Sequence, residues 1–240
     1  MKKLIIVLLV IVALKWWFTD PSIEVITSDP KVEPVTFNYL VKYPNDASKK
    51  AQLPLLIVLH GNGDTPENFY QTALDLLDTQ VRIILVKAPI AYGRGTSWPG
   101  NAAGFKYFGE ALHLAVENFQ TEFPTSGKPI LFGFSGGGMM AYYQALKYGV
   151  DYSVIVPVSG LMSESLIGQP DYATGAMVIA YHGKSDNVVS IGGAKQAIAL
   201  LQSQNVEVDF TEFDGDHHGV FTTMKAEITR KLEQLIISNK

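Results

Sequence analysis

Residues 129–138 have the sequence PILFGFSGGG, and this stretch decides the fold. Its first six residues form a continuous apolar run, which is typical of a strand buried on both faces. Gly133, Ser135 and Gly137 follow the pattern G-x-S-x-G, in which the glycines permit a tight strand-to-helix turn where a Cβ would clash. A helix is expected at 139–148. The pattern predicts that the turn holds Ser135 in a strained conformation, exposed above the sheet edge as a nucleophile.

A glycine-rich loop before a helix is also a feature of phosphate-binding sites. This stretch lacks the Lys of the G-x-x-x-x-G-K-[ST] motif, and it lacks the glycine spacing of a dinucleotide-binding fingerprint. The placement between a buried strand and a helix therefore favours a nucleophilic Ser135.

Apolar runs and helical patterns alternate along the rest of the chain. Strands alternating with helices of ten or more residues predict a mostly parallel central sheet with helices on both faces, in a single α/β domain over 21–240. A long Gly- and Pro-rich loop is expected at 88–103. The expected strands are 35–43, 54–59, 81–86, 152–158, 176–181 and 206–213, and the expected helices begin near 65, 105, 191 and 219.

Two polar clusters follow late strands. His182-Gly183-Lys184-Ser185-Asp186 comes after the strand at 176–181, and Asp186 is placed to orient a histidine base. Asp186 is alternatively a turn-capping residue. His182 ends the strand beside Gly183, and we interpret it as a structural residue that holds the loop by a ring hydrogen bond.

The second cluster, Asp214-Gly215-Asp216-His217-His218-Gly219, lies between the last strand and the last helix. Adjacent histidines point in different directions, so at most one of them is expected to act as the base. A metal site is disfavoured because adjacent ligands chelate one ion poorly and no H-x-x-x-H spacing is present. The chain order Ser, Asp, His matches one of three known serine-hydrolase orders.

The N-terminus differs from the rest of the chain. Lys2 and Lys3 precede an apolar run at 4–14, followed by Lys15 and the aromatic residues 16–18. This is the pattern of a secretory signal peptide or of a signal anchor over residues 1–20, and no A-x-A cleavage site is evident. A buried N-terminal helix is a further alternative. Either export interpretation predicts a body outside the cytoplasm, with membrane contact only through 4–18.

Composition excludes several classes of protein. Hydrophobic residues make up 47% of the 240 residues and charged residues 18%, which is incompatible with a disordered chain. The net charge is −4, and it becomes −6 without residues 1–20, which hold three Lys and one Asp. An acidic body has no general affinity for nucleic acid. The absence of cysteine excludes disulfides, a thiolate metal site and a cysteine nucleophile.

From about residue 52 to 235 the chain resembles the α/β-hydrolase superfamily. It is most similar to the phospholipase/carboxylesterase branch, which includes acyl-protein thioesterases, and to the feruloyl-esterase and polyester-depolymerase branch. The matching motifs are LHGNGD (59–64), GFSGGG (133–138), HGKSD with VV (182–189) and DGDHHG (214–219). The resemblance implies Ser135 as nucleophile, Asp186 as the triad acid, and His218 rather than His217 as the base.

The resemblance also implies an oxyanion hole made by the backbone N–H groups of Asn62 and Gly136. Acyl transfer requires two such donors, and loss of one typically costs ~3 kcal/mol. The side chain of Asn62 either adds a donor or caps the turn, and the sequence does not decide between them.

The sequence departs from the family pattern at positions that bear on which substrate is bound. Gly136 replaces the Gln usual after the serine in thioesterases, and Ser97-Trp98 continues as Pro-Gly-Asn instead of an aromatic-acid pair. The stretch 160–175 is expected to cover the sheet edge, where it could form part of the pocket. Four apolar residues are candidates for the pocket lining or, more often at such spacing, for the core: Met139, Met140, Leu161 and Met162.

The sequence therefore predicts a serine hydrolase that cleaves small-molecule carboxylic esters through an acyl-enzyme, without a metal or organic cofactor. Thioester or lysophospholipid hydrolysis on the same fold is an alternative. A non-catalytic binding protein, tethered to a membrane on a hydrolase scaffold, is a second alternative.

Overall fold

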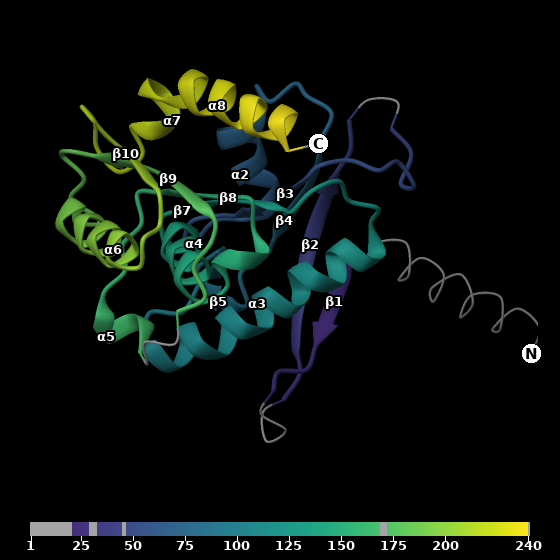
Figure 1. Ribbon diagram of the computed structural model, residues 1–240, viewed down its shortest axis with the longest axis horizontal. Coiled ribbons are helices and arrows are strands. Elements are labelled where there is room, and N and C mark those ends of the chain that lie inside the picture. The colour runs from purple at the N-terminus through teal and green to yellow at the C-terminus, as the bar shows by residue number, and fades with distance from the viewer. Residues whose placement is uncertain (1–20, 29–32, 45–46, 169–171, 240) are drawn as a thin grey trace, which may run out of the picture.

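The computed structural model describes residues 21–28, 33–44, 47–168 and 172–239. The described part is one α/β domain around an eight-stranded sheet with strand order β1-β2-β4-β3-β7-β8-β9-β10 (Figure 1). In this sheet the six strands β4, β3, β7, β8, β9 and β10 pair in parallel with their neighbours. At one edge, β1 pairs antiparallel with β2, and β2 pairs antiparallel with β4. The strands are β1 (Ser22–Val25), β2 (Val35–Lys42), β3 (Leu55–Leu59), β4 (Arg82–Val86), β7 (Ile130–Phe134), β8 (Val154–Val158), β9 (Met177–Gly183) and β10 (Val208–Phe213).

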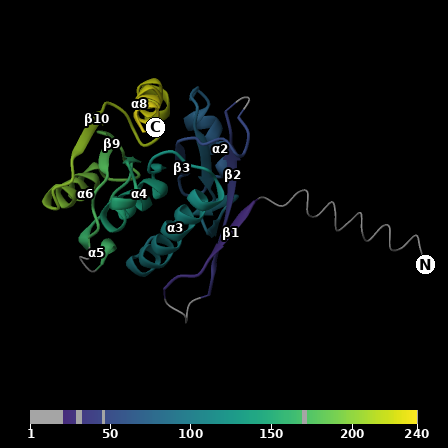
Figure 2. The same ribbon diagram turned by 45° about the vertical axis from the view of Figure 1, so that its right-hand side comes forward.

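Helices cover both faces of the sheet, as predicted. The helices are α2 (Pro66–Phe69), α3 (Ala102–Glu122), α4 (Gly136–Lys147), α5 (Glu164–Ile167), α6 (Ile191–Ser203), α7 (Val220–Thr223) and α8 (Lys225–Ser238), with a π-helical turn η1 (Tyr70–Leu74) and a 3-10 turn η2 (Gly149–Asp151). Figures 1 and 2 show α3, α4 and α6 on one side of the sheet and α2 and α8 on the other.

The side chains of β3 explain this layering. All five residues of β3 are buried, and alternate residues enter different clusters: Leu55, Ile57 and Leu59 pack with α3 and α4, whereas Leu56 and Val58 pack with α2 and α8. Successive side chains of a strand point to opposite faces of the sheet. A continuous apolar run is therefore what a strand between two helical layers requires.

The parallel pairing of the strands determines at which edge of the sheet the candidate site lies. Because β3, β7, β9 and β10 run in the same direction, the loops after them meet at one edge of the sheet. In open α/β sheets this carboxyl edge is where ligands bind.

The structure corrects four details of the expected elements. The strand β1 was not predicted, and the 88–103 loop contains a hairpin of β5 (Ile90–Tyr92) and β6 (Gly95–Ser97). The helix expected from residue 65 is α-helical only to Phe69 and continues as the π-helical turn η1. The terminal helix expected from near residue 219 begins at Val220, but it is divided at Met224 into α7 and α8.

The predicted segment at 1–20, with its interpretation as a signal peptide or anchor, lies outside the described residues. Within the described ranges, no helix has the length and apolar character needed to cross a membrane.

Buried Arg82 holds the start of β4 to two neighbouring loops. Its guanidinium donates hydrogen bonds to the carbonyl oxygens of Pro124 (2.8 Å), Lys49 (3.1 Å) and Ala51 (2.8 Å). The side chain is fully buried and packs against the ring of Phe123. Hydrogen bonds from a charged donor are among the more stabilising ones in proteins.

We expect Arg82→Met to lower the free energy of unfolding by about 3 kcal/mol, because three carbonyl groups lose a charged donor and only the carbonyl of Pro124 keeps another described donor, the N–H of Leu53. Urea unfolding followed by circular dichroism measures this change. Arg94→Met is the matched control, since Arg94 is exposed on the β5–β6 turn. An unfolding midpoint for Arg82→Met equal to that of Arg94→Met would contradict this role.

Candidate active site

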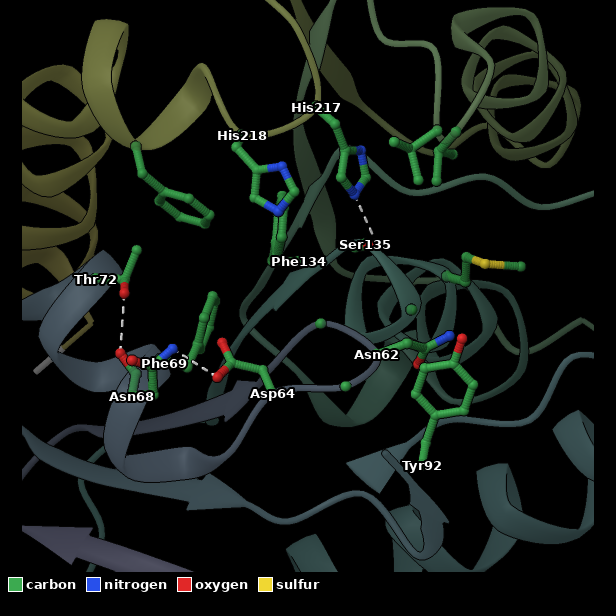
Figure 3. A pocket seen from close by; sticks show the side chains of 17 residues that line it. Asn62, Asp64, Asn68, Phe69, Thr72, Tyr92, Phe134, Ser135, His217 and His218 are labelled. Carbon is green, nitrogen blue, oxygen red and sulfur yellow. Dashed lines mark hydrogen bonds between the residues drawn. The ribbon is translucent and has the colours of Figure 1, made fainter. Parts of the chain in front are cut away.

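The four loops at the carboxyl edge bring together the side chains that the motifs singled out. Ser135 follows β7, Asp186 follows β9, and the two histidines follow β10. Figure 3 shows Ser135, His217 and His218 around one pocket, with Asn62 from the loop after β3 on its opposite wall.

Ser135 occupies the strained turn that its motif predicts. Its φ of 54° and ψ of −117° lie in a region that side-chain-bearing residues rarely adopt. The turn is so tight that a Cβ on Gly133 would overlap the carbonyl oxygen of Gly137. The N–H of Ser135 donates to the carbonyl of Val158 (2.9 Å), which ties the turn to β8.

His217 connects Ser135 to Asp186. Its Nε2 lies 2.9 Å from Ser135 Oγ, and its Nδ1 lies 2.7 Å from Asp186 Oδ2. Asp186 is an acceptor, so His217 Nδ1 carries the proton and Nε2 is free to accept from the serine hydroxyl. The side chains of His217 and Asp186 are 5% and 0% exposed, which shields both hydrogen bonds from water.

The resemblance implied His218 as the base, but it is His217, and not His218, that the structure places between Ser135 and Asp186. The ring of His218 lies beside that of His217 at 5.0 Å and nearly perpendicular to it, and it is directed into the open pocket (Figure 3). The carboxylate of Asp216 accepts from the backbone N–H groups of His218 and Gly219, which turns the chain at this point. This turn leaves His217 buried over Phe134 and His218 exposed.

Asp186 is fixed by backbone donors as well as by His217. Its Oδ1 accepts from the N–H groups of Val188 (2.9 Å) and Val189 (2.8 Å). A buried carboxylate must have its lone pairs satisfied, and these three hydrogen bonds supply that. The turn-capping role and the orienting role that the sequence left as alternatives are therefore both present.

His182 forms the ring hydrogen bond expected of it. Its Nε2 lies 2.8 Å from the carbonyl oxygen of Val189 and 3.3 Å from Asp186 Oδ2. Both neighbours are acceptors, so the proton of the neutral ring is on Nε2. Nδ1 has no hydrogen-bond partner among the described residues. Burial lowers the pKa of His182, which keeps the ring uncharged beside His217.

The loop after β3 is held by Trp98 and His60. The side-chain Oδ1 of Asn62 accepts from the N–H of Trp98 (2.9 Å), and the indole Nε1 of Trp98 donates to the carbonyl of His60 (2.8 Å). The Asn62 side chain therefore braces its loop through its oxygen. Asn62 Oδ1 also lies where a Cβ on Gly136 would be, so the two residues are in direct contact.

His60 is a second support that the motif did not reveal. Its Nδ1 donates to the carbonyl of Gly61 (2.7 Å), and its Nε2 accepts from the N–H of Ala88 (3.1 Å). Burial lowers the pKa of His60, so the ring is neutral and one nitrogen can accept while the other donates. The motif signalled a tight loop but not these contacts, because they come from the 88–98 segment.

The pocket over Ser135 has a volume of about 690 Å³. Of the four candidate lining residues, Met139 borders it, whereas Met140 and Met162 are fully buried in the core. Leu161 packs against Gly193, and no residue of 160–175 that the structure describes lines this pocket. The lining residues are Gly61, Asn62, Gly63, Asp64, Asn68, Phe69, Thr72, Tyr92, Phe134, Ser135, Gly136, Met139, Val188, Val189, His217, His218 and Phe221.

Residues 45–236 match the family model described as phospholipase/carboxylesterase. The chain belongs to this family. A comparison with curated proteins finds no match by sequence.

Within the described residues, no three His, Asp or Glu side chains are grouped so that they could hold a metal ion.

The structure of this family member is similar to several solved esterase structures. Esterase PE8 aligns with a TM-score of 0.67 and 20% identity over 85% of this chain and 99% of the other. A carboxylesterase of Bacillus cereus aligns with a TM-score of 0.68 and 14% identity over 85% of this chain and 95% of the other. Acyl-protein thioesterase 2 of Zea mays aligns with a TM-score of 0.61 and 21% identity over 82% of this chain and 98% of the other. These similarities show the α/β-hydrolase fold that the sequence predicted.

Proposed function

We propose that the protein is a serine esterase that hydrolyses carboxylic esters through an acyl-enzyme. The observation that carries the proposal is the continuous chain of hydrogen bonds from Ser135 through His217 to Asp186. The strained, glycine-flanked turn supports it, since such a turn presents a serine hydroxyl above the sheet edge.

In the first half of the reaction, Ser135 Oγ attacks the ester carbonyl while His217 Nε2 takes the hydroxyl proton. Asp186 keeps the proton on Nδ1 and stabilises the imidazolium that forms. The imidazolium then donates its proton to the leaving alcohol oxygen. In the second half, His217 removes a proton from water, which attacks the acyl-enzyme, and Ser135 regains its proton as the acid leaves.

The backbone N–H groups of Asn62 and Gly136 are the proposed oxyanion donors. Gly136 is the first residue of α4, so its N–H has no partner within the helix. No described hydrogen bond uses the N–H of Asn62, and the two residues touch beside Ser135. Donors that are already in place when charge develops on the carbonyl oxygen lower the activation barrier most effectively.

We expect Ser135→Ala to lower kcat for p-nitrophenyl butyrate by at least 10⁴-fold while leaving the fold intact, because the nucleophile is removed. A fluorophosphonate probe should label the wild-type protein and not Ser135→Ala, since only an activated serine reacts. Ser159→Ala is the matched control: it also removes a serine at positive φ, but this serine is buried after the next strand. Undiminished turnover by Ser135→Ala would refute the mechanism.

A further inference from the structure

The pocket over Ser135 has two chemically different sides. One side carries Asp64, Asn68, Thr72 and His218, and we name these four residues the polar arm. Figure 3 shows them on the same side of Ser135. Met139, Val188 and Val189 line the pocket elsewhere with apolar side chains, next to the polar Asn62 and Tyr92. Such a division suits an ester whose acyl and alcohol parts differ in polarity.

The free polar atoms on the Asp64–Thr72 wall are mainly hydrogen-bond acceptors. Asp64 Oδ1 accepts from Thr65 N and Asn68 Nδ2, and no described residue donates to its Oδ2. Thr72 Oγ1 donates to the carbonyl of Asn68, and no described residue donates to it. Asn68 Oδ1 is likewise without a described donor. A ligand that fits these atoms must supply O–H or N–H groups.

The charge of the lining is unsuited to anions. None of the lining residues is Lys or Arg, and Asp64 adds a carboxylate. A phosphate or carboxylate on the ligand would have no cation to pair with, and its acceptor oxygens would face other acceptors. The lining therefore disfavours lysophospholipids and other phosphate-bearing esters.

His218 and the aromatic side chains complete the arm. The exposed His218 ring has no hydrogen-bond partner among the described residues, so one nitrogen can donate and the other can accept. Phe69 and Phe221 meet edge to face at 5.7 Å and form an apolar wall between α2 and α7. Hydroxyl groups can both donate and accept, whereas an ammonium group can only donate.

We propose that the polar arm is the subsite for the alcohol part of the ester, and that this alcohol is an uncharged polyol such as glycerol or a sugar. The inference rests on the proposed esterase function. His217 must protonate the leaving oxygen, and His218 is its immediate neighbour, so the departing alcohol lies against the arm. The hydroxyl groups of a polyol donate to Asp64 and Asn68, while its carbon skeleton packs on Phe69 and Phe221.

Butyrate esters with different alcohols test the proposal, since the acyl part stays constant. The series comprises ethyl butyrate, monobutyrin, 6-O-butyrylglucose, butyrylcholine and 1-butyryl-glycerol 3-phosphate, each followed by release of butyrate. We expect kcat/KM for the two polyol esters to exceed that for ethyl butyrate by about tenfold or more, as one or two additional hydrogen bonds would give. Equal values for the ethyl and polyol esters, or preference for the choline or phosphate ester, would overturn the subsite.

Variants of the polar arm test whether its side chains cause the preference for polyol esters. Thr72→Val and the double variant Asn68→Leu/Thr72→Val should lose about tenfold in kcat/KM for the polyol esters and little for ethyl butyrate. Thr121→Val is the matched control, because Thr121 Oγ1 also donates to the carbonyl four residues earlier, in α3. Gln71→Leu controls for a more apolar surface, since Gln71 is exposed and does not line the pocket. A parallel loss on ethyl butyrate would indicate a structural role and contradict the proposal.

The outcome also separates this inference from the proposed function. If p-nitrophenyl butyrate is hydrolysed in a Ser135-dependent manner but the polyol esters are not preferred, only the subsite is wrong. If no butyrate ester is hydrolysed, the esterase function itself is wrong.

Discussion

Replacing His217 with Ala is expected to lower kcat/KM for p-nitrophenyl butyrate by about 10⁴-fold or more, because the group that accepts the serine proton is lost. The neighbouring change, His218→Ala, is expected to lower it by less than about tenfold. His217 Nε2 lies 2.9 Å from Ser135 Oγ, whereas the His218 ring faces the open pocket. Initial rates of p-nitrophenol release on the two purified variants measure the difference.

The two histidine variants control for each other, since each removes one imidazole from the same loop. Far-ultraviolet circular dichroism of both variants checks that the fold is retained. Loss of fluorophosphonate labelling should accompany His217→Ala and not His218→Ala. The opposite ranking would show that the loop rearranges in solution and that His218 is the base.

Asp186→Asn is expected to lower kcat at neutral pH by about 10⁴-fold. The amide oxygen can still accept from Val188 and Val189, so the loop keeps its shape. The amide nitrogen, however, donates toward His217 Nδ1, which moves the histidine proton to Nε2, where it faces Ser135. The imidazole then cannot accept the serine proton. Single-turnover rates of acylation with p-nitrophenyl butyrate isolate the affected step.

Asp214→Asn is the matched control for this change. Asp214 carries the same side chain on the loop after β10, but it is 90% exposed and pairs with Lys184. We expect its acylation rate to stay within about twofold of the wild type, as is usual for exposed ion pairs. Retention of most activity by Asp186→Asn would mean that His217 is oriented without the carboxylate.

Much of the fold follows from local sequence patterns. The run at 54–59 and the run at 129–134 are buried strands because helical layers on both faces leave no room for polar side chains. The hairpin β5–β6 could not be recognised in this way. Its strands have three residues each, β5 is exposed on all three, and a Cβ on Gly95 would overlap the carbonyl oxygen of Gly63. Contact with a distant loop, and not local periodicity, holds it in place.

The sequence predicted the type of candidate site and the positions of two of its residues, but not the contacts that hold the site together. Ser135 and Asp186 sit where the motifs placed them, because a strand end and the turn after it define each position. The motif around 182–189 also signalled a structural His182, but not its position beside Asp186. The roles of Trp98 and His60 depend on packing between segments more than twenty residues apart, so no local pattern encodes them. Export of the chain, predicted from residues 1–20, stays a prediction.

By itself the sequence determined the layered α/β architecture, the turn that exposes Ser135 and the edge of the sheet where the polar loops meet. These depend on hydrophobic periodicity and on glycine sterics, which act over a few residues. Only the tertiary structure decided between His217 and His218. Both residues are identical in type and adjacent in the chain, and the direction of each ring depends on how the Asp216 turn packs against β7 and the Asp186 loop.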